Sequence, residues 1–274
     1  MVAGRTEQLA SAFRALHEPG RILLLPNAWD ALSARVIQEC GAQAIATTSS
    51  GLSWAHGCSD GEHLSPEVLV TALGEIVRAS ALPVTADIEA GYSRDPKQVG
   101  VLVSAIIASG AVGINLEDGA APADLLVAKI GSARRASASA GVSLFVNART
   151  DVFLKRLVSP ERAIDETVAR ARRYREAGAD GIFVPGLIEP EAIRCIAEAV
   201  ALPLNVMVGA GLPPMSVLQG CGVRRVSAGA SLCRASFGAA RRATERFLAE
   251  HQYDLLLDGT FAQAELNAMF AKPD

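Results

Sequence analysis

Residues 82–118 read LPVTADIEAGYSRDPKQVGVLVSAIIASGAVGINLED, and they contain two short apolar runs separated by a longer segment of helical period. The runs lie at residues 83–87 and 113–117, and each ends in a carboxylate. The Asp-Pro pair at residues 95–96 is typical of a helix N-terminus. This stretch therefore predicts a strand, a helix and a second strand, with an acid at the end of each strand.

The same unit recurs about eight times along the chain. Its strands are nearly continuous apolar runs, which is typical of parallel sheets covered on both faces. We therefore predict an α/β fold, a (β/α)8 TIM-type barrel. An open doubly wound sheet would need G-x-G-x-x-G after its first strand, where this chain has PNAWDAL. The predicted strands are residues 21–26, 44–48, 83–87, 113–117, 143–148, 181–185, 204–208 and 225–228, and the clearest helices are 30–39, 66–79, 96–109 and 160–177.

The C-terminal part extends beyond the eight units. We predict one barrel domain over residues 1–274, in which residues 231–252 form a long helix and residues 258–274 a helical tail. The short helix at 261–270 carries Phe261 and three other apolar side chains on an appendage. It either folds onto its own barrel or packs against a second subunit.

Composition excludes several classes of protein. The chain has 274 residues, 50% of them hydrophobic, and a net charge of −3 without a basic block, so nucleic acid is not an expected partner. Its apolar runs are shorter than the roughly 18 residues that span a bilayer, and the N-terminus lacks a secretory signal. Five scattered cysteines without a C-x-x-C pair fit reduced thiols. We expect a cytoplasmic protein without a membrane partner.

The strand ends carry the candidate chemistry, because active sites of such barrels lie at the carboxyl ends of the strands. Asp87, Glu89 and Glu117 gather there. Buried acids are unfavourable unless paired or bound to a cation, and a hard ion such as Mg2+ prefers oxygen ligands. Arg149 follows the next strand, either as a fork for a substrate carboxylate or as a structural ion pair. Two further acids, Asp118 and Asp151, either join the site or cap the next helix.

Several motifs together resemble the isocitrate lyase/phosphoenolpyruvate mutase superfamily. They follow one another in order and at the spacing of that family. They are LPNAWDAL at 25–32, SGL at 50–52 followed by Asp60, ADIEAGY at 86–92, LED at 116–118 and NARTD at 147–151.

The resemblance implies a Mg2+-dependent enzyme, with Mn2+ as a substitute, that acts on a small carboxylic acid such as a 2-oxo acid. It implies that Asp87 contacts the metal and that acids matching Asp60, Glu89 and Glu117 hold metal-bound waters. It also implies that the substrate carboxylate binds the stretch Ser50, Gly51 and Leu52 together with Asp87 and Arg149. The family is generally a homotetramer, a dimer of dimers, in which a C-terminal helix is exchanged between subunits.

The chain also departs from this family. The lyases carry a K-K/R-C-G-H loop after the fourth strand, whereas residues 118–124 read DGAAPAD, and the Asn of the mutase loop is missing too. Gly186 and Met207 stand where methylisocitrate lyases hold a distal carboxylate with Glu and Asn. We therefore expect a smaller or less charged leaving fragment. Without the loop Cys, the proton donor is His56, Cys58, Tyr92 or a metal-bound water.

The leading functional prediction is a C–C lyase or decarboxylase for oxaloacetate-like or small isocitrate-like acids, working through a metal-stabilised enolate. The alternative within the family is a phosphonopyruvate-type hydrolase or mutase, which breaks or rearranges a C–P bond. A barrel without catalytic activity that binds a 2-oxo acid is another. A further class is an isomerase or synthase that holds a phosphate on the glycine-rich loops 209–211 and 228–231.

Overall fold

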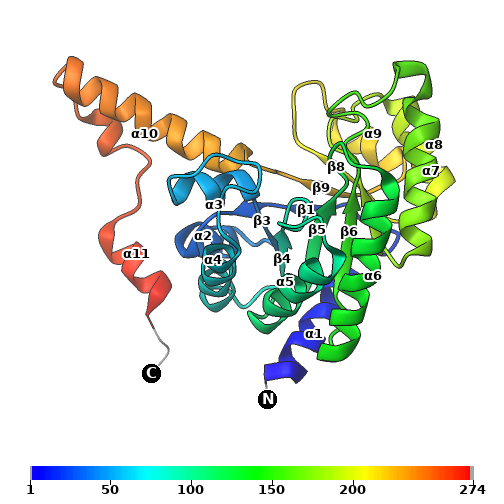
Figure 1. The fold of residues 1–274 in the computed structure, drawn as a ribbon. Helices are drawn as coiled ribbons and strands as arrows, with labels where there is room; N and C mark the ends of the chain where they lie inside the picture. Colours follow the sequence, from blue (N-terminus) through cyan, green and yellow to red (C-terminus); the bar gives the residue numbers. More distant parts are fainter. Residues whose placement is uncertain (1, 272–274) are drawn as a thin grey trace.

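The computed structural model describes residues 2–271, and at its centre is a ring of parallel strands surrounded by helices (Figure 1). All neighbouring strands pair in parallel, in the order β1-β9-β8-β7-β6-β5-β4-β3-β2. The strands are β1 (Leu23–Leu25), β2 (Asn27–Ala28), β3 (Ile45–Thr47), β4 (Val84–Asp87), β5 (Gly113–Glu117), β6 (Phe145–Arg149), β7 (Gly181–Phe183), β8 (Leu204–Met207) and β9 (Val223–Ser227).

The ring closes through its first strand. β1 pairs with β9, β2 pairs with β3, and Pro26 alone separates β1 from β2. Proline has no N–H to donate to a strand ladder, so the predicted strand 21–26 is reduced to β1, and β2 follows beyond its predicted end. The predicted α/β barrel of TIM type is therefore confirmed.

Helices cover the outside of the ring, and helix α5 begins at the predicted Asp-Pro pair. The Asp95 side chain accepts the Lys97 N–H at 2.9 Å at the start of α5, directly before Pro96. Two helices, α1 and α3, were not among the predicted elements, and residues 160–162 form a 3-10 turn before α7. The helices are α1 (Val2–Ala15), α2 (Ala31–Glu39), α3 (Ser49–Ala55), α4 (Pro66–Ala79), α5 (Pro96–Ala108), α6 (Ala123–Ala140), α7 (Ala163–Glu176), α8 (Pro190–Val200), α9 (Met215–Gly220), α10 (Ser231–Ala249) and α11 (Gln263–Phe270).

The barrel interior is polar as well as apolar. Asn147 on β6 donates from Nδ2 to the side-chain oxygens of Asn115 on β5 and Asn205 on β8, at 2.9 and 3.1 Å. At the amino end of the strands, His17 stacks on Phe145 with ring centroids 4.1 Å apart, next to α1. Burial lowers the pKa of His17 to about 3, so this histidine is a neutral part of the barrel floor.

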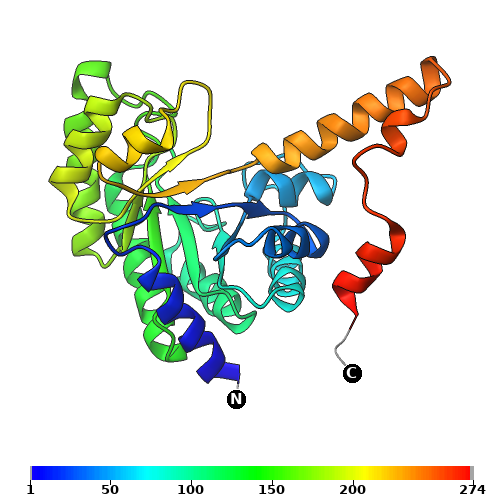
Figure 2. The same ribbon diagram turned by 180° about the vertical axis from the view of Figure 1, so that it is seen from behind.

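The C-terminal helices extend away from the barrel, as the two opposite views show (Figures 1 and 2). α10 ends at Ala249, three residues before the predicted end at 252, and α11 begins at Gln263 rather than 261. Apolar side chains on this extension are solvent-exposed, including Leu248 and Leu257 at 67% each. Exchange of this segment between subunits stays a prediction. Among residues 2–271, we find no helix with the length and apolar character of a membrane span.

Asp118, one of the acids at the strand ends, belongs to a buried network that joins β5 to α7. Its Oδ2 accepts the hydroxyl of Tyr174 at 2.6 Å and lies 2.9 Å from Nη1 of Arg170. Its Oδ1 accepts the backbone N–H of Asp151 at 3.0 Å. Asp118 is thus fully engaged with the protein, so it supports the barrel mouth rather than a ligand.

We expect Tyr174→Phe to lower the free energy of unfolding by about 1.5 kcal/mol, because a buried carboxylate oxygen loses a donor. Urea denaturation monitored by circular dichroism measures this loss. Tyr253→Phe is the matched control, since Tyr253 is 65% exposed and its hydroxyl is solvated. Equal stability of Tyr174→Phe and the wild type would contradict the structural role of Asp118.

Candidate active site

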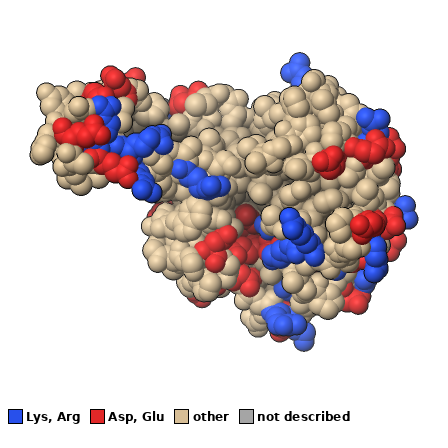
Figure 3. Space-filling model, turned by 90° about the horizontal axis from the view of Figure 1, so that it is seen from above, with Lys and Arg blue, Asp and Glu red and all other residues tan. Residues whose placement is uncertain are grey.

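Three neighbouring strands bring the predicted acids and the predicted arginine to one end of the barrel. Asp87, Glu117 and Arg149 are the last residues of β4, β5 and β6. Glu117 and Arg149 are partners in the parallel ladder, and their side chains form an ion pair, with Nη1 2.9 Å from Oε2. Viewed from above, acidic side chains gather beside a hollow in this face, with basic side chains next to them (Figure 3).

Arg149 is held by two carboxylates. Its Nε donates to Oδ1 of Asp151 at 2.7 Å while Nη1 pairs with Glu117. Lys155 approaches from the same loop, with Nζ 2.8 Å from Oδ2 of Asp151 and 3.9 Å from Oε1 of Glu117. These anions raise the pKa of Arg149 further above its ordinary value, although burial opposes them. The guanidinium therefore carries a permanent positive charge at the mouth of the barrel.

Asp87 is oriented by backbone N–H groups. Those of Ser49 and Glu89 hydrogen-bond its carboxylate, the latter at 3.3 Å. Burial raises the pKa of Asp87 above its ordinary value, whereas Arg149 and the two N–H groups lower it and the charge of Asp60 raises it. A cation at this position would remove the unfavourable effect of burial on the ionised form.

Glu89 is the second acid of this end, and burial raises its pKa to about 7. Its Oε2 accepts the backbone N–H of Glu62 at 2.9 Å, and its Oε1 accepts the hydroxyl of Tyr92 at 3.2 Å. The charges of Asp87 and Asp60 raise the pKa of Glu89 as well. The predicted metal-site acids therefore lie close enough to influence one another.

Glu117 is the third acid, and burial raises its pKa to about 8. Arg149 and Lys155 lower this pKa, whereas the charges of Asp151 and Asp87 raise it. Three acids with raised pKa values, of which Glu89 is buried and Asp87 and Glu117 are partly buried, form a site with a deficit of positive charge.

The predicted substrate-binding stretch lies in the first turn of α3. Thr48 caps this helix, and a Cβ on Gly51 would come within 2.9 Å of the Trp29 side chain, so close packing requires glycine there. Ser50 donates from Oγ to Oδ2 of Asp60 at 2.8 Å. Leu52 is buried, and its N–H donates to the Thr48 carbonyl, so Leu52 has no free donor for a substrate.

The three candidate proton donors differ in position. His56 hydrogen-bonds through Nδ1 to the Leu52 carbonyl of its own helix, and Cys58 contacts the His56 carbonyl at 3.8 Å. No hydrogen bond or ion pair joins either side chain to the predicted metal acids within residues 2–271. Tyr92, by contrast, donates directly to Glu89.

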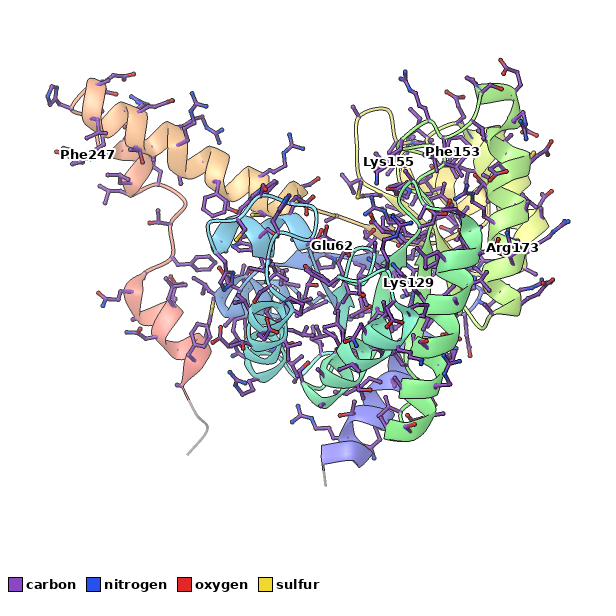
Figure 4. The ribbon with its side chains drawn as sticks, in the orientation of Figure 1. Glu62, Lys129, Phe153, Lys155, Arg173 and Phe247 are labelled. Carbon is purple, nitrogen blue, oxygen red and sulfur yellow. The ribbon has the colours of Figure 1, made fainter. Side chains whose placement is uncertain are left out.

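The loop after β5 is short, as the sequence predicts, and α6 starts at Ala123. Gly119 stands beside Glu117 and Lys155, and a Cβ there would lie 3.4 Å from the Lys155 ammonium. Lys155 thus occupies the side of the mouth where this loop carries no cation (Figure 4). This residue was not among those predicted from the sequence. Its spacing of four residues from Asp151 is the sequence signal that points to it.

One of the two glycine-rich loops of the phosphate hypothesis, residues 228–231, has N–H groups that are already engaged. The N–H of Gly229 donates to Oδ1 of Asn27 at 2.8 Å, and the N–H of Ser231 donates to the Ala228 carbonyl at 3.2 Å. A phosphate site at residues 228–231 would lack these two donors. The geometry of this loop therefore argues against its part in a phosphate site.

The acids fit a hard cation that is bound largely through water. Among residues 2–271, no three His, Cys, Asp or Glu side chains close into a ready-made metal cage. Mg2+ typically takes one or two carboxylates directly and keeps several waters, which other acids then hold. The all-oxygen donor set of Asp87, Glu89 and Glu117 and its deficit of positive charge match that pattern.

Barrel and acidic mouth together define the class of α/β-barrel proteins with a carboxylate-lined site at the strand ends, and comparison with known proteins identifies the family. The phosphoenolpyruvate phosphomutase family matches residues 13–248. The chain belongs to this family, within the isocitrate lyase/phosphoenolpyruvate mutase superfamily of lyases and mutases.

Individual relatives agree with this assignment. An uncharacterised protein of Mycobacterium tuberculosis is 35% identical over 80% of this chain and 81% of its own length. A Burkholderia cenocepacia structure provisionally classed as a phosphonomutase is 40% identical, with a TM-score of 0.84 over 88% of this chain and 99% of its own. The structure of 2,3-dimethylmalate lyase is 26% identical, with a TM-score of 0.83 over 95% and 94%. Other relatives are named 2-methylisocitrate lyase and oxaloacetate decarboxylase.

The raised pKa values predict how stability depends on pH. Glu89 and Glu117 have pKa values of about 7 and 8 in the fold against 4.5 for the model compound. Between pH 4.5 and 8 the folded state thus binds more protons than the unfolded state, so stability decreases as pH rises. In metal-free protein these two shifts together correspond to a loss of about 6 kcal/mol between pH 5 and 8.5.

Urea unfolding in EDTA across this pH range measures the slope. Glu117→Gln should flatten it, because the variant no longer titrates at that position. A metal-free wild type that is more stable at pH 8.5 than at pH 5 would contradict the predicted protonation of these acids.

Proposed function

We propose that this protein is a Mg2+-dependent lyase that cleaves a C–C bond next to the carbonyl of a small 2-oxo acid or related carboxylic acid. The observation that carries the proposal is the convergence of Asp87, Glu89 and Glu117 around the mouth beside Arg149. Relatives named for lyase and decarboxylase activities on small carboxylic acids support it.

Each group has a role in this scheme. Asp87 would hold the metal directly, and Asp60, Glu89 and Glu117 would hold it through water. A bound Mg2+ supplies positive charge next to the oxygen on which negative charge develops. Arg149 and the Ser50–Gly51 turn orient the substrate carboxylate, so that the bond to be broken faces the buried acids.

Of the candidate proton donors, Tyr92 is favoured by its contact with Glu89. Burial and the neighbouring carboxylates raise the pKa of the Tyr92 phenol, so the hydroxyl stays protonated at neutral pH. His56 is the alternative, and its Nδ1 is held by the Leu52 carbonyl, which leaves Nε2 for a substrate. The preferred substrates are oxaloacetate-like, because Gly186 and Met207 bring no group for a distal carboxylate.

A second candidate function is C–P chemistry on a phosphonopyruvate-type substrate. Lys155 supports it, because this ammonium adds a second positive charge beside Arg149 at the mouth. A phosphonate carries more negative charge than a carboxylate and profits from two cations. The family profile and the Burkholderia relative are in line with this alternative.

A substrate panel with and without EDTA separates these functions. We expect Mg2+-dependent release of pyruvate, glyoxylate or oxalate from one C–C substrate, whereas phosphate or pyruvate release from phosphonopyruvate would establish the second function. Binding of a 2-oxo acid without turnover would instead identify a barrel that only binds. Asp87→Asn should reduce turnover about 1000-fold, which corresponds to about 4 kcal/mol.

Two further variants complete this test. Arg149→Lys should raise KM about 30-fold, because an ammonium cannot reproduce the two-pronged contact with a carboxylate. Asp124→Asn is the control for Asp87→Asn, since the Asp124 side chain is 83% exposed and pairs with Arg173 outside the mouth. Unchanged turnover in Asp87→Asn would refute the role of Asp87 in binding the metal.

We also propose that α11 and the segment before it pack against a second copy of the chain, as part of a dimer of dimers. The support is the exposure of large apolar side chains on this extension. They include Phe247, Tyr253, Leu257, Phe261 and Phe270, of which Phe247 is labelled in Figure 4. Apolar surface of this kind is stabilised when a partner covers it.

Truncation after Asp258 should therefore shift the protein to a smaller assembly, measured by sedimentation velocity. Phe261→Ser with Phe270→Ser in the full chain should have the same effect, because these changes remove apolar area without shortening the backbone. If both proteins keep the size of the wild type, the tail does not hold the assembly.

A further inference from the structure

Glu62 lies on the loop between α3 and α4, and the reaction scheme above does not use it (Figure 4). Its backbone N–H donates to Oε2 of Glu89 at 2.9 Å, and its own Oε1 accepts the backbone N–H of Tyr92 at 2.6 Å. The Tyr92 hydroxyl donates to Oε1 of Glu89 at 3.2 Å. These three residues thus form a closed ring of hydrogen bonds, here called the Glu62 clamp.

The backbone of the Glu62 clamp is strained. Glu62, Glu89 and Tyr92 have φ values of +63°, +50° and +58°, which place all three in the left-handed region that favours glycine. Such conformations are unfavourable for residues with side chains and persist where the surrounding contacts demand them. Three strained residues that hydrogen-bond one another therefore indicate that the fold fixes the geometry of this part of the barrel mouth.

The loop that carries Glu62 also carries Asp60. Asp60 accepts the Ser50 hydroxyl at 2.8 Å, so the loop is attached to α3 at one point and to the residues after β4 at another. The charge of Asp60 raises the pKa values of Asp87 and Glu89, which places it near both acids. The position of Asp60 thus depends on both attachments.

We propose that Glu62 is a positioning residue, whose carboxylate oxygen holds the Tyr92 backbone and thereby orients Glu89 and Asp60 around the metal position. Glu62 acts as a hydrogen-bond acceptor rather than as a charge. The clamp joins two loops of the mouth, the one between α3 and α4 and the one after β4. The effect on metal binding rests on the proposed function, whereas the clamp itself does not.

Two variants separate the acceptor from the charge. Glu62→Ala removes the acceptor, whereas Glu62→Gln keeps an amide oxygen that can accept the Tyr92 N–H without a negative charge. We expect Glu62→Ala to weaken Mg2+ binding about 10-fold in isothermal titration calorimetry, as for other groups that orient metal-binding acids. Glu62→Gln should stay within about 3-fold of the wild type.

Amide hydrogen exchange of the metal-free protein tests the clamp without any ligand. In Glu62→Ala the amides of Glu62 and Tyr92 should exchange about 10-fold faster, because one hydrogen bond is lost and another is loosened. Glu67→Ala is the matched control, an exposed acid in the first turn of α4. It should change neither quantity.

The outcomes are distinct. Wild-type exchange rates in Glu62→Ala would overturn the clamp, and equal losses of affinity in Glu62→Gln and Glu62→Ala would show that charge rather than the acceptor matters, which also overturns it. A wild-type protein that does not bind Mg2+ would refute the proposed function, and the exchange rates would still decide whether the clamp exists.

Discussion

Arg149 lies between the carboxylates of Glu117 and Asp151, and the charge balance of the barrel mouth depends on this arrangement. One permanent cation is shared by two buried anions, so neither anion has full compensation. Lys155 adds a second, half-exposed cation on the outer side. The acids deeper in the mouth remain undercompensated, and burial favours their protonated forms. A hard cation would relieve this deficit of positive charge, which supports the proposed metal site.

The same residue type serves different purposes at neighbouring strand ends. Asp118 and Asp151 accept hydrogen bonds and ion pairs from the protein itself, whereas Asp87 is held by backbone N–H groups and keeps capacity for a ligand. The polar layer of Asn115, Asn147 and Asn205 lies inside the barrel, where Asn147 bonds the other two amides and the buried Arg225 guanidinium donates to Asn115. The hydrogen-bond and ion-pair partners of each acid, rather than its residue type, therefore distinguish the structural acids from the candidate site acids.

Two loops of the mouth are held together by side-chain to backbone hydrogen bonds. The segment between α3 and α4 reaches the residues after β4, and three residues of this contact have a left-handed backbone. Strain of this kind is tolerated where a site requires a fixed geometry. The apolar extension from α10 onward lies outside this arrangement and bears on assembly instead.

Much of this could be predicted from the order of residues along the chain. The continuous apolar strands and the Asp-Pro helix start at residues 95–96 predict strand–helix units, because these signals are local. The motifs around Asp87, Glu117 and Arg149 predict which strand ends carry the chemistry, because parallel strands place their carboxyl ends on one side. Helix α3 was not predicted, because its Ser-Ser-Gly start resembles a loop. Lys155 was not predicted either, because its role depends on its distance from Glu117 in the folded chain. The opposing roles of Asp118 and Asp87 and the clamp formed by Glu62, Glu89 and Tyr92 depend on contacts between residues up to 56 positions apart. Such contacts, and the burial that shifts each pKa, exist only once the barrel has closed, so three-dimensional packing decided them.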